Sequence, residues 1–182
     1  MREGPSALTG RAITREAGCA AGLLHKYFGD LEQFLTQLVV RRFRIQAEAA
    51  AELPAQAGTA SVEDNLTDAA LALLESRTLA TAHLVIARPS LRPLVETILA
   101  SGAPGLPEVT ASIATYLERE TELGRVAESA DCQSIALALV GTVHHMLLTG
   151  STDKTSPDAG IRRLVRTLTV GVIIDIAADN PR

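Results

Sequence analysis

The chain has very few aromatic side chains with which to build a core. Its 182 residues include three Phe, two Tyr and no Trp, although 47% of them are hydrophobic. The core must therefore come from Ala, Leu, Val and Ile, a composition that favours helices. The same shortage argues against single-strand nucleic-acid binding, which uses stacked aromatic rings. The length suits one sizeable core, or a small module joined to a larger one.

Apolar residues recur at helical spacing throughout, and no strand-like alternation of any length occurs. We therefore predict an all-α fold, with helices over residues 9–17, 22–28, 31–53, 62–76, 79–88, 91–100, 108–123, 131–149 and 158–178. Thr9 and Asp30 stand where N-caps belong, and Asp131 and Asp158 are acids suited to the positive end of a helix dipole. Glu118, Glu120 and Glu122 are spread around one helix, as expected for a solvated face.

The cysteines and the longest uncharged run argue against a disulfide-rich protein, a zinc protein and a membrane protein. Cys19 and Cys132 lie too far apart in sequence to suggest a disulfide framework or a zinc site, which fits a reduced, cytoplasmic setting. Residues 132–152 carry no charge, but polar side chains interrupt them, so we predict a buried helix and no membrane association. Because His144 and His145 point about 100° apart on a helix, they cannot form a paired metal site.

No catalytic signature is visible. The sequence has no nucleophile elbow, HExxH motif or phosphate-binding loop. We therefore expect that the protein is not an enzyme and that it has no cofactor and no metal.

Residues 8–30 have the layout of a helix-turn-helix, in which a first short helix braces a second one that enters the major groove of DNA. The string resembles the helix-turn-helix of TetR-family transcriptional regulators at Thr9, Arg11, Ile13, Ala17, Gly18, Gly22, Leu24, Tyr27 and Phe28. The resemblance implies DNA contacts from Thr9, Arg11, Ala20, Ala21, Gly22, Leu23, His25, Lys26 and Tyr27. A merely solvated helix face is the alternative for the polar members of this set.

The sequence also departs from the family pattern. Ala20 stands where the family often has Ser, and Leu31 stands where a phosphate-binding Lys is common. Only seven residues precede Leu8, whereas the family has a complete first helix there. Two explanations stay open: the start at Met1 is misassigned or truncated, or the DNA-binding unit lacks the helix that would cover Ile13 and Phe28.

The resemblance further implies two domains. Residues 1–45 would bind DNA, and residues 46–182 would bind an effector and form a homodimer through the last two helices, 131–149 and 158–178. The broad apolar faces of these helices favour a dimer, and close helix packing would account for Gly141 and Gly171 within them. Polar side chains in apolar surroundings are candidates for the effector site, namely His83, Arg88, Tyr116 and His144.

The distribution of charge agrees with this plan. The net charge of -4 divides into +3 for residues 1–45 and -7 for the remainder. We expect a regulator that binds double-stranded operator DNA and a small, mainly apolar effector, acting as a repressor that the effector releases. The alternative is a dimeric small-molecule-binding protein that has lost operator binding.

Overall fold

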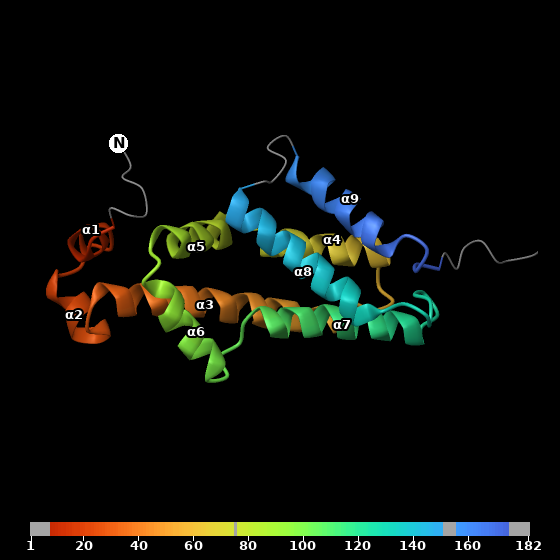
Figure 1. Cartoon of the computed structure of the whole chain (residues 1–182), viewed down its shortest axis with the longest axis horizontal. Coiled ribbons are helices and arrows are strands. Elements are labelled where there is room, and N and C mark those ends of the chain that lie inside the picture. The colour runs from red at the N-terminus through yellow and green to blue at the C-terminus, as the bar shows by residue number, and fades with distance from the viewer. Residues whose placement is uncertain (1–7, 75, 151–155, 175–182) are drawn as a thin grey trace, which may run out of the picture. The chain divides into compact units, whose positions relative to one another are not determined.

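The computed structural model describes residues 8–74, 76–150 and 156–174, and within them it is helical, with nine α-helices (Figure 1). They are α1 (Gly10–Glu16), α2 (Gly22–Phe28), α3 (Leu31–Ala51), α4 (Val62–Leu73), α5 (Ser76–Ala87), α6 (Leu91–Ala100), α7 (Leu106–Glu122), α8 (Cys132–Thr149) and α9 (Pro157–Thr169). A 3-10 helix, η2 (Leu53–Gln56), follows α3. The predicted all-α fold class is confirmed.

The expected caps form. The Thr9 hydroxyl accepts a hydrogen bond from the backbone N–H of Ala12 at 3.2 Å, and Asp30 accepts one from Gln33 at 2.8 Å. Asp131 caps α8 by accepting from the N–H of Ser134 at 3.0 Å. Side-chain acceptors thus satisfy N–H groups that the first turn of a helix leaves without partners.

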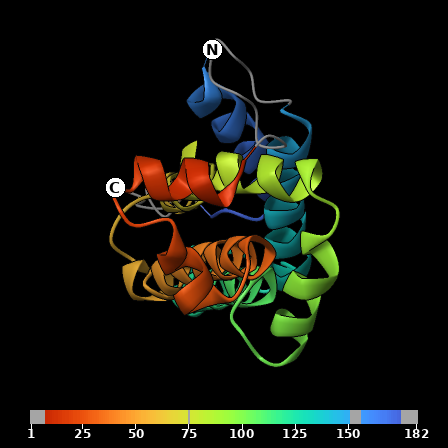
Figure 2. The ribbon, with the colours of Figure 1, turned by 90° about the vertical axis from the view of Figure 1, so that its left-hand side faces the viewer.

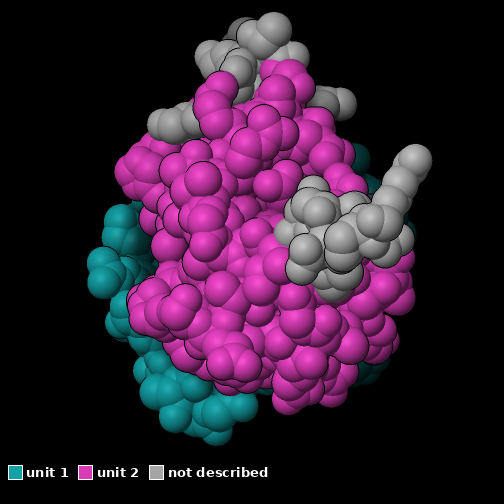
Figure 3. All heavy atoms as spheres, turned by 90° about the vertical axis from the view of Figure 1, so that its right-hand side faces the viewer, with its two compact units in different colours: residues 1–45, 76–104 teal, residues 46–75, 105–182 magenta. Residues whose placement is uncertain are grey.

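The chain divides into two compact units, which Figure 3 colours separately. Unit 1 comprises residues 1–45 and 76–104, and unit 2 comprises residues 46–75 and 105–182. In this division residues 76–104 group with residues 1–45, so unit 1 consists of two separate stretches of the chain.

Unit 1 has an aliphatic core shared by α3, α5 and α6. Its buried members are Leu35, Val39, Val40, Leu84, Leu91 and Val95. Ile13 from α1 and Phe34 from α3 pack against this cluster, and the ring of Phe28 meets that of Phe34 edge-on at a centroid distance of 4.9 Å. These contacts attach the two short helices to the rest of unit 1.

Unit 2 is formed by α4, α7, α8 and α9, with α7 packed against α8 and α4 packed against α9. Val109, Ile113, Leu139, Val143 and Ile161 are among its buried residues. By length and composition α8 could cross a membrane, but a third of that stretch, 33%, is buried within the protein. This helix therefore presents one buried side and one exposed side.

Glu120 corrects the expectation of a solvated acidic face. Its neighbours Glu118 and Glu122 are exposed, but Glu120 is fully buried. The Glu120 carboxylate accepts from the N–H of Gly58 at 3.2 Å and lies 3.4 Å from Nε of Arg125. Spacing along α7 could not show this burial, because the covering loop is 62 residues away.

The loop that covers Glu120 is held by its backbone. Arg119 donates to the carbonyl of Pro54 at 2.8 Å, and Arg125 donates to the carbonyl of Ala60. Together with the bond from Gly58 to Glu120, these contacts fasten residues 54–60 to α7 and the segment after it.

The last helix is shorter than expected. The helix ends at Thr169, whereas the sequence predicted that it would run to Ala178. Residues 175–178 of the predicted helix lie outside the described part of the chain. After Thr169, the N–H of Ala127 binds the carbonyl of Val172 and the N–H of Ile174 binds the carbonyl of Arg125. These bonds compete with the helical pattern, and β-branched Val and Ile favour the extended form. Gly171 therefore lies outside α9, with a left-handed φ of 77°.

Candidate nucleic-acid interface

The two short helices of unit 1 form a helix-turn-helix (Figure 2). Gly18 allows the turn between them because its φ of 64° lies in the left-handed region, where a Cβ would be strained. The hydroxyl of buried Thr14 donates to the carbonyl of Gly10 at 3.0 Å, which satisfies its polar group inside the unit. The second helix follows the turn directly and has no fully buried residue.

All nine residues expected at a DNA surface are exposed. On α1 and its cap these are Thr9 and Arg11, and on α2 and the turn before it they are Ala20, Ala21, Gly22, Leu23, His25, Lys26 and Tyr27. Leu24 and Phe28, which face the core, are half-buried. Arg15 is a further exposed cation on α1 outside the expected set, and its spacing of four residues from Arg11 could have indicated it.

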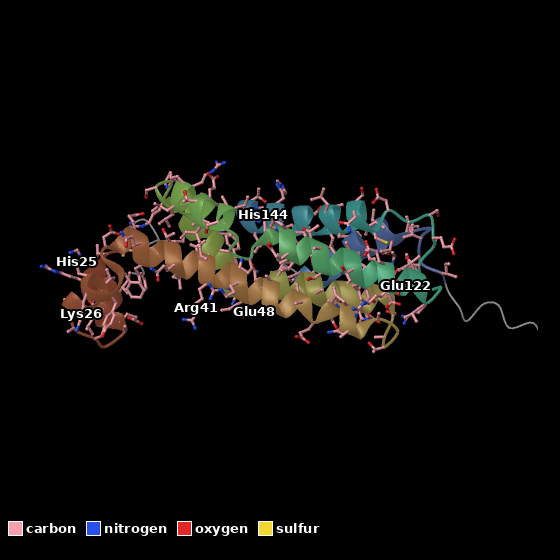
Figure 4. All side chains as sticks on the ribbon, turned by 90° about the horizontal axis from the view of Figure 1, so that it is seen from below. His25, Lys26, Arg41, Glu48, Glu122 and His144 are labelled. Atoms are coloured by element: carbon pink, nitrogen blue, oxygen red, sulfur yellow. The ribbon has the colours of Figure 1, made fainter. Side chains whose placement is uncertain are left out.

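The outward face of α2 is polar and cationic. His25 and Lys26 project away from the ribbon in Figure 4, and the hydroxyl-bearing ring of Tyr27 is 68% exposed. The ammonium of Lys26 lies 5.5 Å from the centroid of the Tyr27 ring, within the range of a cation–π contact. Such side chains can donate hydrogen bonds to phosphates and base edges. By contrast, Ala20 and Ala21 offer only methyl groups, and no side chain caps α2.

Arg88 ties the helix-turn-helix to the remainder of unit 1. Its guanidinium donates to Glu32 at 2.8 Å and also to the carbonyl of Leu8, immediately before α1. The other carboxylate oxygen of Glu32 accepts from the hydroxyl of Ser90 at 2.8 Å. We call this set, Leu8, Glu32, Arg88 and Ser90, the Arg88 clamp. Since its members come from three separate segments, sequence spacing gave no signal for it.

The four candidate effector residues have different environments. His83 is exposed on α5, and Arg88 belongs to the clamp; both lie in unit 1. Tyr116, in unit 2, is fully buried and its hydroxyl accepts from the amide of Asn65 at 3.1 Å. Burial, followed by a hydrogen bond to Glu120, raises the pKa of the Tyr116 hydroxyl far above its ordinary value. Protein partners thus occupy Arg88 and Tyr116.

His144 differs from these because it lies half-buried on α8, also in unit 2. Desolvation lowers the pKa of its imidazole below the ordinary value. His145, the next residue, is exposed. Within residues 8–74, 76–150 and 156–174, no group of three or more His, Cys, Asp or Glu side chains could hold a metal ion.

The fold and the exposed two-helix face define an all-α protein with an N-terminal helix-turn-helix, and comparison with solved structures makes the fold more specific. A protein of Mesorhizobium loti MAFF303099, assigned to the TetR family of transcriptional regulators, superimposes with a TM-score of 0.68. The alignment covers 90% of this chain and 83% of that one, at 17% identity. GusR of Salmonella enterica gives a TM-score of 0.62 over 91% and 86% of the two chains, also at 17% identity.

The protein therefore has a TetR-like fold. The structural likeness extends through most of both chains, well beyond the two-helix motif. No family model and no curated protein matches the sequence.

Proposed function

We propose that the chain is a homodimeric, cytoplasmic transcription regulator that binds operator DNA and releases it when a small, mainly apolar effector binds. It would thus act as a repressor without catalysing a reaction. The observation that carries the proposal is the exposed, cationic face of α2 in a helix-turn-helix whose apolar side is packed on its own core. The TetR-like fold supports the same assignment.

The charge distribution supports DNA binding by the first 45 residues. These carry a net charge of +3, and the remaining residues carry -7. The basic segment would approach phosphates, while the acidic remainder would oppose non-specific wrapping of DNA. In a two-fold dimer, two copies of α2 would read half-sites about one helical turn apart.

The exposed side of α8 supports dimerisation. Leu137 is 64% exposed and Leu148 is 39% exposed, and Gly141 between them has open space where a Cβ would be. These residues are spaced at four and seven positions, so they share one stripe of the helix. An apolar stripe with a glycine permits close approach of a second helix. Exposed Leu residues would be covered by a second copy of α8.

The outward side of α9 is polar, unlike the expectation of a broad apolar face. Arg162, Arg163 and Arg166 are exposed there, and Arg162 pairs with Asp64 at 2.8 Å. Ile161 and Val165 are buried on the opposite side. We therefore assign the centre of the dimer interface to α8 and its polar edge to α9.

The DNA assignment is tested by fluorescence anisotropy. The full chain is titrated onto labelled duplex taken from upstream of its own coding sequence, with unrelated duplex as competitor, at two salt concentrations. Lys26→Ala should weaken DNA binding. It should also make the slope of the logarithm of the binding constant against the logarithm of the salt concentration shallower by about 1 per protomer, since each phosphate contact contributes roughly 0.9. Arg92→Ala, an exposed cation on α6, is the matched control. Absence of salt-dependent, sequence-selective binding would refute the regulator.

The dimer is tested by sedimentation velocity. Leu137→Arg should convert a dimer into a monomer, because a buried guanidinium without a partner is costly at an interface. Leu123→Arg, at an apolar residue 52% exposed at the end of α7, should leave the dimer intact. A dimer that survives Leu137→Arg would contradict the α8 interface.

The alternative, a dimeric small-molecule-binding protein without an operator, has two specific observations in its favour. At the start of α2, Ala20 and Ala21 bring no hydrogen-bonding side chain. Leu31, where the resembled family has a phosphate-binding Lys, packs against the core of unit 1. The same titration distinguishes the two functions, because this alternative predicts an intact dimer with no selective DNA binding.

A further inference from the structure

Unit 1 contains an open groove between α3 and α5, with a volume of about 390 Å³. Helix α3 contributes Leu38, Arg41, Arg42 and Ile45. Helix α5 contributes Ala80, Thr81 and Leu84. The volume falls within the range of roughly 300–1,000 Å³ found for small-molecule sites. None of the four effector candidates from the sequence lines this groove.

The groove exposes aliphatic surface. Leu84 of the lining is buried, but Leu38 is 46% exposed and Ile45 is 41% exposed. Leu38 and Ile45 lie seven positions apart, and so share a side of α3. Because no aromatic ring lines the groove, an aliphatic ligand suits it better than a stacked planar one.

One edge of the groove is cationic. Arg41 is exposed and projects from α3 in Figure 4, and its guanidinium makes no hydrogen bond or ion pair with the described part of the chain. Arg42 is a second arginine of the lining. Between Glu32 and Glu48, α3 has no acidic residue. The groove therefore joins apolar surface to a guanidinium that can bind a carboxylate through two parallel hydrogen bonds.

We propose that this groove binds an amphipathic monoanion, an unbranched aliphatic chain that ends in a carboxylate. The chain would lie against Leu38, Ile45 and Leu84, and the carboxylate would accept hydrogen bonds from Arg41. A compact inorganic anion would leave the aliphatic surface exposed, and a cationic amphiphile would be repelled by Arg41. Charge complementarity thus selects this occupant.

The site also has a route to the DNA-binding helices, and this step rests on the proposed function. Helix α3 carries Glu32 in its first turn, and α5 ends directly before Arg88. A ligand lodged between α3 and α5 would bias their separation, and the Arg88 clamp joins the ends of both to the segment before α1. Ligand binding would thereby shift the equilibrium between two arrangements of α3 and α5 and so change how the Arg88 clamp holds the segment before α1. The size of the shift is set by the difference in ligand affinity between the two arrangements.

The test measures binding directly by isothermal titration calorimetry on the full chain, with dodecanoate below its micellar range as the probe. Dodecanol and dodecyltrimethylammonium serve as neutral and cationic analogues. Arg41→Gln should weaken dodecanoate binding by roughly tenfold or more, since it removes a charge-assisted pair. It should leave the affinity for dodecanol unchanged. Arg92→Gln, at an exposed cation of α6 that does not line the groove, is the matched control for charge.

A second variant keeps the test independent of charge. Ala80→Leu fills the groove and should abolish dodecanoate binding, whereas Ala111→Leu, at an exposed alanine of α7, should not. Circular dichroism verifies that each variant is folded. Equal dodecanoate binding by wild type, Arg41→Gln and Ala80→Leu would overturn the site. So would equal affinity for the cationic analogue.

DNA binding separates this inference from the proposed function. Dodecanoate that binds in the groove and lowers operator affinity supports both proposals. Selective DNA binding without dodecanoate binding overturns the groove site and leaves the regulator standing. Dodecanoate binding by a chain that never binds DNA selectively supports the site, and overturns both the regulator and the route through the clamp.

Discussion

The Arg88 clamp should contribute measurably to stability, and its removal is the sharpest test of the packing in unit 1. Glu32→Ala removes the acceptor for both Arg88 and Ser90. The side chains of Arg88 and Glu32 are 16% and 35% exposed, so the pair is neither fully buried nor fully solvated. Hydrogen bonds to charged groups contribute about 1.5–3 kcal/mol, between the values for exposed and buried ion pairs.

This free energy corresponds to a fall in Tm of roughly 3–12 °C, since 1 kcal/mol shifts the Tm of a chain of this size by about 2–4 °C. The measurement is thermal unfolding by calorimetry of Glu32→Ala, Arg88→Met and the double variant. The coupling free energy of the double-mutant cycle should be about 1 kcal/mol or more. Glu32→Gln, which keeps an acceptor oxygen, should lose less stability.

The chain offers a matched control in Arg92 and Glu96. This pair also has a distance of 2.8 Å, but its side chains are 76% and 61% exposed. Glu96→Ala should therefore cost about 0.5 kcal/mol or less. If Glu96→Ala destabilises as strongly as Glu32→Ala, or if the coupling of Arg88 to Glu32 is near zero, burial does not set the strength of the clamp.

Three further predictions concern single residues. Tyr116→Phe removes one of the two acceptors of the Asn65 amide, which also donates to the carbonyl of Gln56, and should lower the unfolding free energy by about 1–3 kcal/mol in urea titrations. Gly171→Ala should cost about 1 kcal/mol by the same measurement, because a Cβ is strained at a φ of 77°. His144 has a lowered pKa in the folded state, so stability should be fully present above the ordinary value of 6.5 and lost as pH falls through the folded-state pKa. His144→Gln should flatten this pH dependence of Tm, and His145→Gln should not.

Local features were predictable from the sequence because they depend on neighbouring residues. The caps at Thr9 and Asp30 form as expected, since each needs only an N–H group three residues away. The exposed face of α2 likewise follows from the spacing of Leu24 and Phe28, which orients the residues between them outward. The helix-turn-helix could therefore be placed before its structure was known.

Features that join distant segments were not predictable. Arg88 looked like a polar residue in apolar surroundings and hence a candidate for the effector site, but it pairs with Glu32, 56 positions away. Glu120 looked solvated because the loop that covers it lies 62 positions away in the chain. The groove with Arg41 was missed because α3 and α5 are separated by η2 and α4 in the chain. Periodicity reports which side of a helix is apolar, and does not report what covers it.

The loop of residues 54–60 shows where this protein can change. It is fastened through the carbonyls of Pro54 and Ala60 and the N–H of Gly58, groups that most residue types supply equally well. The side chains that make these three bonds belong to α7 and the residues after it, and Asn65 of α4 donates a further bond to the carbonyl of Gln56 at 3.3 Å. A saturation library should therefore tolerate most replacements at Ala55, Gln56 and Thr59, and should be depleted at Glu120 and Arg125. The sequence of this loop is free to diverge while its shape is retained.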